Sequence, residues 1–80
     1  MMMSIEDQIC KAVKASVPNS KVEVTGNGGH FSLRVTAAIF EGKKTLEKQR
    51  MVYSALTELM SGINAPVHAI DNLETLVPEN

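Results

Sequence analysis

The longest helical pattern of apolar and polar positions runs from about Lys44 to Met60. Its apolar residues recur at spacings of three, four and seven, which is typical of an amphipathic helix with one buried side. We expect that side to carry Leu46, Val52, Tyr53, Leu56, Leu59 and Met60. Gly42 or Thr45 marks the start of the helix. Ser61-Gly62 marks its end, because glycine readily adopts the left-handed conformation common at helix C-termini.

The other patterns predict a second helix and three strands. Ser4 is a suitable N-cap for a helix that Pro18-Asn19-Ser20 stops, and the acidic Glu6 and Asp7 in its first turn suit the helix dipole. Residues 21–25 and 31–36 predict a β-hairpin around a glycine-rich turn at residues 26–29. A short helical turn is expected at residues 37–40, and a third strand at residues 67–73. The order α-β-β-α-α-β predicts one α+β domain spanning residues 1–80.

The connection between the second and third strands has a consequence for two histidines. It is about thirty residues long and contains a helix, as expected between parallel neighbouring strands. Parallel neighbours start at the same end of a sheet, so His30 and His68, at the starts of these strands, should lie at the same end. Adjacent strands are about 4.8 Å apart, which brings two imidazoles within reach of a shared ligand.

Side-chain alternation along the two strands should turn both histidines outward. Inward positions at Val67 and Ala69 leave His68 on the outer face, and they leave Ile70 there as well. His30 precedes an inward Phe31 and therefore also points outward.

Composition narrows the class of protein. Eighty residues with 44% hydrophobic content form one globular domain whose core is only marginally large enough to hold a fold. The single cysteine, Cys10, has no partner for an internal disulfide and is interpreted as a small half-buried hydrophobic residue. The sequence contains neither a secretory signal nor a membrane-spanning run, so we expect a reducing, cytoplasmic location and no membrane partner.

The charge is small but unevenly placed. The net charge of -1 argues against a general polyanion binder. Four bases nevertheless gather in one turn and helix start: Lys43, Lys44, Lys48 and Arg50. They suit sequence-independent contacts to phosphates, or alternatively form a solvated helix face that includes Glu47.

The two histidines are the main candidates for metal or cluster ligands. Two imidazoles cannot complete a tetrahedral zinc site, and no other spacing supplies more ligands. They are therefore either surface side chains or part of a shared site, because imidazole can replace thiolate on one iron of a 2Fe-2S cluster when a partner provides the sulfur ligands. Asp71 and Glu74, close to His68 in the sequence, are interpreted as orienting or surface carboxylates. No catalytic grouping is suggested by spacing, so we expect no enzymatic activity.

Four motifs carry a family resemblance: Phe40-Glu41-Gly42-Lys43, Gln49-Arg50-Met51-Val52-Tyr53, Val67-His68-Ala69 and Gly26-Asn27-Gly28-Gly29-His30-Phe31. The chain resembles the BolA family over nearly its whole length, and most closely the short, acid-stress-associated BolA-like subgroup. The resemblance implies a KH type II-like α-β-β-α-α-β fold, with a three-stranded mixed sheet and the helices on one face.

The resemblance also implies a function. BolA-like proteins form complexes with monothiol glutaredoxins in which a 2Fe-2S cluster is shared, with thiolates from glutaredoxin and glutathione. The matching ligand in this chain is His68, in the hydrophobic-His-Ala element. His30 is the sole candidate for the family's second ligand, although it also matches a His-Phe pair at the strand start of some members. We expect a role in iron-sulfur trafficking or iron and stress regulation, with no cofactor in the free monomer and a heterodimer with glutaredoxin.

The alternative function is nucleic-acid binding and transcriptional regulation. KH-like folds approach a nucleic-acid backbone with a glycine-rich turn between two helices, and some BolA relatives are associated with DNA. By this resemblance the contact residues, with DNA as the partner, would be Gly42, Lys43, Lys44, Lys48 and Arg50.

Overall fold

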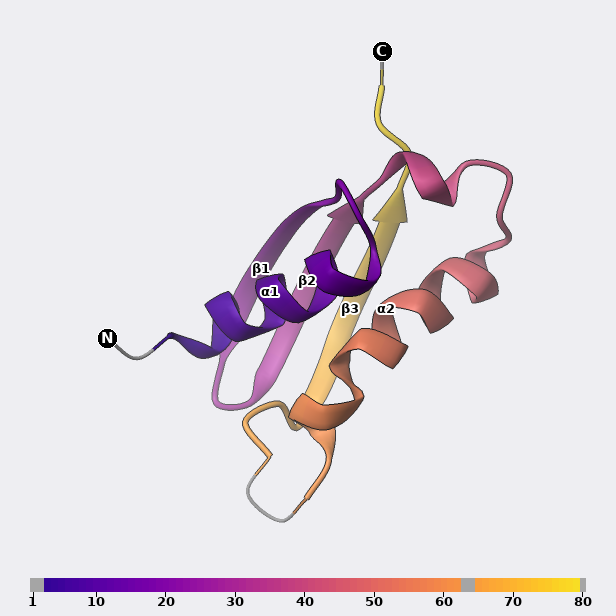
Figure 1. Cartoon of the computed structure of the whole chain (residues 1–80). Helices are drawn as coiled ribbons and strands as arrows, with labels where there is room; N and C mark the ends of the chain where they lie inside the picture. Colours follow the sequence, from indigo (N-terminus) through magenta and orange to yellow (C-terminus); the bar gives the residue numbers. More distant parts are fainter. Residues whose placement is uncertain (1–2, 63–64, 80) are drawn as a thin grey trace.

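The computed structural model describes residues 3–62 and 65–79. Its elements are helix α1 (Ile5–Ser16), strands β1 (Lys21–Asn27) and β2 (His30–Thr36), a 3-10 turn η1 (Ala38–Phe40), helix α2 (Thr45–Met60) and strand β3 (Ala69–Leu76). Figure 1 shows both long helices on the same side of the sheet. The predicted element order is confirmed. The short helical turn expected at residues 37–40 is the 3-10 turn η1.

The sheet has the order β1-β2-β3. β1 and β2 form an antiparallel hairpin, while β2 and β3 are parallel neighbours. The long connection through η1 and α2 is therefore the crossover that the parallel pairing requires. The predicted α+β fold with a three-stranded mixed sheet is confirmed.

Helix α1 begins and ends as its sequence predicts. The Ser4 hydroxyl oxygen accepts a hydrogen bond from the Asp7 amide at 3.1 Å, which satisfies one of the free N–H groups of the first turn. At the other end, the Val17 amide donates to the Val13 carbonyl at 2.7 Å. Asn19 then adopts a φ of +58°, which turns the chain towards β1.

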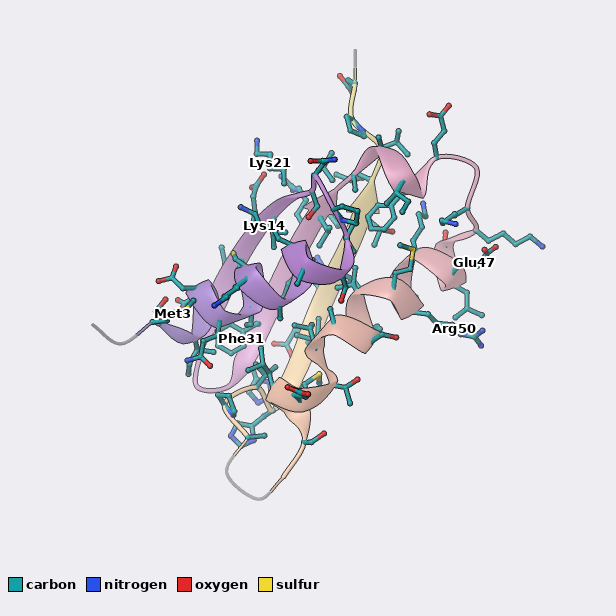
Figure 2. All side chains as sticks on the ribbon, viewed as in Figure 1. Met3, Lys14, Lys21, Phe31, Glu47 and Arg50 are labelled. Carbon is teal, nitrogen blue, oxygen red and sulfur yellow. The ribbon has the colours of Figure 1, made fainter. Side chains whose placement is uncertain are left out.

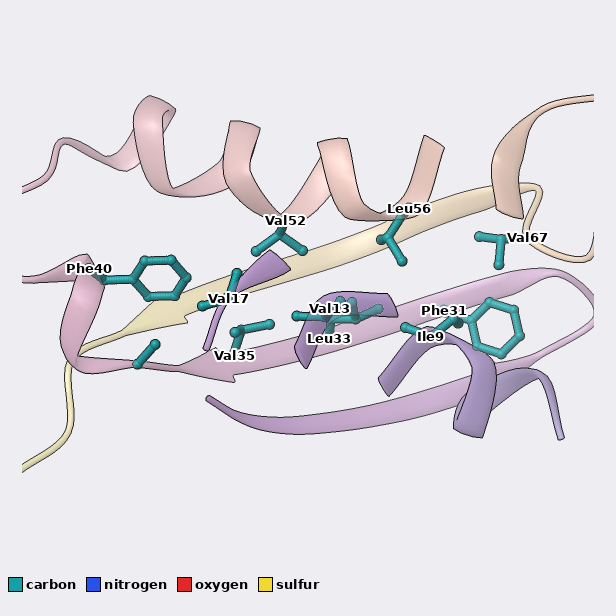
Figure 3. Packing of buried hydrophobic residues seen from close by; sticks show 11 residues of the cluster. Ile9, Val13, Val17, Phe31, Leu33, Val35, Phe40, Val52, Leu56 and Val67 are labelled. Carbon is teal, nitrogen blue, oxygen red and sulfur yellow. The ribbon is translucent and has the colours of Figure 1, made fainter. Parts of the chain in front are cut away.

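The core lies between the two helices and the covered face of the sheet (Figure 3). It is aliphatic apart from two phenylalanines, Phe31 from β2 and Phe40 from η1. Its other buried members are Ile9, Val13, Val17, Leu33, Val35, Ala37, Val52, Leu56 and Val67. Burying one large apolar side chain of this core contributes about 1.5–3 kcal/mol, a sizeable share of the stability of a small domain.

Helix α2 buries a narrower side than its sequence pattern predicts. Val52 and Leu56 are fully buried, and Leu59 and Met60 pack partly against the core. The expected burial of Leu46 and Tyr53 is wrong, because their exposed fractions are 58% and 40%. Successive residues of a helix are about 100° apart, so the sheet covers the Val52 side of α2 but not the adjacent Tyr53 side.

Strand β3 starts later than predicted, and this reverses the expected directions of two side chains. Val67 is buried as expected but precedes the strand. In the strand itself Ala69 lies opposite His30, and Ile70 lies opposite the buried Phe31 and packs against the core. The predictions of an inward Ala69 and an outward Ile70 are therefore wrong, because pairing with β2 begins at Ala69 and the alternation counted from Val67 does not extend into the strand.

Candidate functional site at the histidine rim

The two histidines lie at the same end of the sheet, as the crossover predicts. His30 is the first residue of β2, and His68 directly precedes the first residue of β3. Both side chains are exposed, as predicted. In Figure 1 the β1–β2 turn and the segment that enters β3 lie together at the lower end of the sheet. We call the group of Gly29, His30, His68 and Asp71 the histidine rim.

The ring of His30 is held by a carboxylate from the neighbouring strand. Its Nδ1 atom lies 3.2 Å from Oδ1 of Asp71, and both side chains are 59% exposed. This contact favours a proton on Nδ1, which leaves Nε2 as the nitrogen with a free lone pair. Asp71 therefore orients His30, whereas its sequence position had suggested a role beside His68.

The backbone of His68 is held by the β1–β2 turn. The carbonyl oxygen of Gly29 accepts hydrogen bonds from the amides of His68 at 2.7 Å and of Ala69 at 3.0 Å. These two bonds connect the turn to the start of β3, and they place His68 next to the first residue of β2.

The imidazole of His68 packs directly on Gly29. Gly29 is buried, and a Cβ atom built on it would collide with Cδ2 of His68 and lie 2.8 and 3.1 Å from Cγ and Nε2. A side chain at position 29 would thus occupy the space that the ring fills. Sequence reasoning identified the turn glycines but not this contact, which depends on the register of β3 against β2.

The histidine rim offers too few ligands for a metal site of its own in the part of the chain that the structure describes. Among the described residues, 3–62 and 65–79, no group of three or more His, Cys, Asp and Glu side chains could hold a metal ion. Two exposed imidazoles can serve as two ligands of a group whose remaining ligands come from another molecule. Within that same part of the chain, no helix has the length and apolar character needed to cross a bilayer.

Cys10 lies outside the rim. Its Sγ atom is 3.9 Å from the carbonyl oxygen of Val22, which pairs with Val35 at the far end of the hairpin from His30. Burial raises the pKa of the Cys10 thiol, and this disfavours the thiolate that metal binding or redox chemistry needs. The half-buried position agrees with the interpretation of Cys10 as a small apolar residue.

The basic turn, residues 42–50, lies at the opposite end of the sheet from the histidine rim. It follows η1, which continues from the C-terminal end of β2. Gly42 has a φ of +79°, and the next amide, of Lys43, donates to the Phe40 carbonyl at 3.1 Å. Phe40 is buried and fixes the turn to the core.

The cations of the basic turn are free of acidic partners within the described structure. None of the ion pairs found there includes the four predicted bases Lys43, Lys44, Lys48 and Arg50. Lys44 and Arg50 are exposed, and Lys43 and Lys48 are half-buried. Figure 2 shows Arg50 and Glu47 projecting outward from α2. Glu47 is 3.5 Å from the Lys44 amide, so it serves the helix start.

The uncovered face of the sheet forms a third surface, a shallow polar hollow. Arg34 of β2 lies there between Glu23 of β1 and Glu74 of β3, which are its direct neighbours in the strand pairing. Glu74 therefore pairs with Arg34 and takes no part in holding either histidine.

Comparison with known proteins agrees with this geometry. The profile of the BolA-like protein family matches residues 4–80. A bolA protein homologue from Coxiella burnetii is 32% identical, with a TM-score of 0.75, and the match covers 96% of this chain and 94% of that one. An uncharacterized protein from the rpoN-murA intergenic region of Acinetobacter guillouiae is 34% identical over 64 residues, or 80% of this chain and 75% of the relative.

A more distant structure shares the fold. BolA1 from Arabidopsis thaliana has a TM-score of 0.79 at 15% identity, and the match covers 96% of this chain and 95% of that one. The arrangement of two helices on one face of a mixed three-stranded sheet is therefore retained at low sequence identity.

Proposed function

The chain belongs to the BolA-like protein family, and from this premise we propose that it is a partner of a monothiol glutaredoxin with which it shares a 2Fe-2S cluster. Its role would be to supply protein ligands in iron-sulfur trafficking or in iron and stress regulation, without catalysis of its own. The free chain would carry no cofactor, and the working unit would be a heterodimer.

The observation that carries the proposal is that His68 is exposed at the same end of the sheet as His30. Imidazole is a known ligand of 2Fe-2S iron, and a site with too few ligands of its own requires a partner. His68 would hold the cluster, with His30 as the second imidazole. Glutaredoxin and glutathione would supply the thiolates. When bound, the cluster supplies a transferable iron-sulfur centre.

Two finer assignments accompany this proposal. Residues 26–31, with their Gly-x-Gly-Gly-His-Phe sequence, support placement in the short acid-stress-associated subgroup. The single half-buried cysteine, whose thiol pKa is raised by burial, suits the reducing cytoplasm.

The direct test is to mix the chain with cluster-loaded monothiol glutaredoxin and to record visible absorption and circular dichroism. The native chain is expected to change the spectrum, because replacing a cluster ligand by imidazole alters the electronic environment of the iron. The His68→Ala variant should lose that change, and His30→Ala tests the second ligand. A sizing column measures complex formation in parallel.

The matched control is the Lys43→Ala, Lys44→Ala variant, which alters the opposite end of the sheet and should retain the native spectrum and complex. If His68→Ala leaves both the cluster spectrum and the affinity unchanged, His68 is not a ligand. If the native chain neither changes the spectrum nor co-elutes with glutaredoxin, the shared-cluster function is wrong.

A second candidate function is nucleic-acid binding by the basic turn, in transcriptional control. It is favoured by the exposed Lys44 and Arg50, which have no acidic partner in the described ion pairs and lie beside the turn at Gly42. The start of α2 adds the partial positive charge of a helix N-terminus. Because the basic turn and the histidine rim lie at opposite ends of the sheet, the two functions are compatible.

A further inference from the structure

The histidine rim contains two supporting contacts, and each crosses between β2 and β3. His30 belongs to β2, but its ring is held by Asp71 of β3. His68 leads into β3, but its ring rests on Gly29, which leads into β2. Each imidazole is thus positioned by a residue from the other strand's segment.

The Asp71 contact depends on an irregularity in β3. Ile70 pairs with Phe31 and Asn72 pairs with Ser32, so Asp71 is an extra residue with no partner on β2. Such a bulge redirects a side chain relative to the regular strand. Here it leaves the Asp71 carboxylate beside the first residue of β2, at hydrogen-bonding distance from Nδ1 of His30.

The preferred tautomer of the neutral His30 ring follows from this contact. A carboxylate accepts hydrogen bonds and cannot donate one, so it favours the neutral tautomer with the proton on Nδ1. The lone pair then sits on Nε2, the ring nitrogen that does not face Asp71. Carboxylate partners fix histidine ligands of metals in this way.

The missing side chain of Gly29 leaves the space in which the His68 ring lies. The ring fills the place that a Cβ atom at residue 29 would take, so any other residue there would displace the imidazole. The neighbouring Gly28 provides a natural contrast. It also has a positive φ, +61° against +83° for Gly29, but a Cβ atom built on Gly28 has no atom within 4 Å.

We propose that Asp71 and Gly29 are positioning residues that preset the two imidazoles before a partner arrives, Asp71 by fixing the tautomer of His30 and Gly29 by seating the ring of His68. This inference rests on the proposed function for its purpose, since the preset rings are the ligands offered to the shared cluster. The contacts themselves are properties of the chain alone.

The Asp71 part is tested on the isolated chain by the 15N chemical shifts of the His30 ring at about pH 8.5, above the ordinary histidine pKa of about 6.5. The native chain should show mainly the Nδ1–H tautomer. Asp71→Asn should shift the ratio towards the Nε2–H form that neutral imidazole prefers in water. Asp7→Asn, the same chemical change on α1, should leave it unaltered. An equal tautomer ratio in the native chain and Asp71→Asn overturns this part.

The Gly29 part is tested by comparing Gly29→Ala with Gly28→Ala, because both place alanine at a positive φ but only the first meets the ring. Gly29→Ala should shift the His68 ring resonances in the isolated chain, while Gly28→Ala should not. It should also weaken the cluster-dependent complex with glutaredoxin by about tenfold or more, because the loss of an outer support of a metal ligand typically lowers metal affinity by that factor. Identical His68 resonances in both variants overturn this part.

The steric contact between Gly29 and His68 can also be tested if the Gly29→Ala variant does not fold. If Gly29→Ala unfolds and Gly28→Ala does not, the added change His68→Ala should restore folding by removing the ring, and a failure to restore it overturns the steric contact. The measurements on the isolated chain separate this proposal from the glutaredoxin function. The isolated chain could show both ring contacts while His68→Ala leaves the cluster spectrum unchanged. That result would refute the shared cluster but not the two contacts.

Discussion

The guanidinium of Arg34 meets the carboxylate of Glu74 through two contacts across the β2–β3 pairing. Nε lies 3.4 Å from Oε2, and Nη2 donates to Oε1 at 3.5 Å. On the other side, Nη1 of Arg34 lies 3.9 Å from Oε2 of Glu23 on β1. One cation thus joins all three strands on the uncovered face of the sheet, where directly opposed charges of opposite sign favour the observed register.

We expect this pair to contribute little to stability. The side chains of Arg34 and Glu74 are 50% and 42% exposed, so solvent screens their attraction. A double-mutant cycle of Arg34→Ala and Glu74→Ala, measured by urea unfolding, should give a coupling free energy of about 0.2–1 kcal/mol. High salt should reduce it further. A coupling unaffected by salt would contradict the exposed geometry.

Leu56 and Leu46 should respond very differently to truncation although they share helix α2. Leu56 is fully buried and Leu46 is 58% exposed. Leu56→Ala should cost about 2–5 kcal/mol, through lost burial and the cavity that it leaves. Leu46→Ala should change the free energy of unfolding by less than about 0.5 kcal/mol. The comparison is made from urea unfolding midpoints. Equal losses would mean that α2 faces the sheet with a different side.

The topology was predictable because it depends on features that are local in the sequence. Hydrophobic periodicity located both helices, the glycines at residues 26–29 located the hairpin turn, and the length of the crossover favoured parallel β2 and β3. That pairing was enough to predict that His30 and His68 lie at the same end of the sheet. The exposure of Leu46 and Tyr53 was not predictable, because periodicity gives an apolar stripe without saying how much of it the sheet covers.

The details of the histidine rim were not predictable for a different reason. The Asp71–His30 contact needs the bulge in β3, and the Gly29–His68 contact needs the exact start of that strand. A shift of one residue in a strand moves every side chain to the other face, so the alternation assumed from Val67 placed Ile70 on the wrong side. Only the pairing of Ile70 with Phe31 resolves this.

The basic turn leads to a prediction about salt dependence. Each phosphate contact by a lysine releases condensed counterions, so DNA affinity should fall with rising salt in proportion to the number of contacts. Lys43→Ala, Lys44→Ala should weaken binding to duplex DNA and lower the slope of log affinity against log salt by up to about 2 units. Fluorescence anisotropy over a series of salt concentrations measures both effects.

His68→Ala is the matched control for this experiment, because it alters the opposite end of the sheet and leaves all four cations of the basic turn in place. It should bind DNA with the native affinity and the native salt slope. With a net charge of -1, the chain has no general attraction for polyanions, so any binding must come from the local charge of this turn. If the native chain binds no DNA even at low salt, the basic turn is a solvated helix start and the nucleic-acid function is wrong.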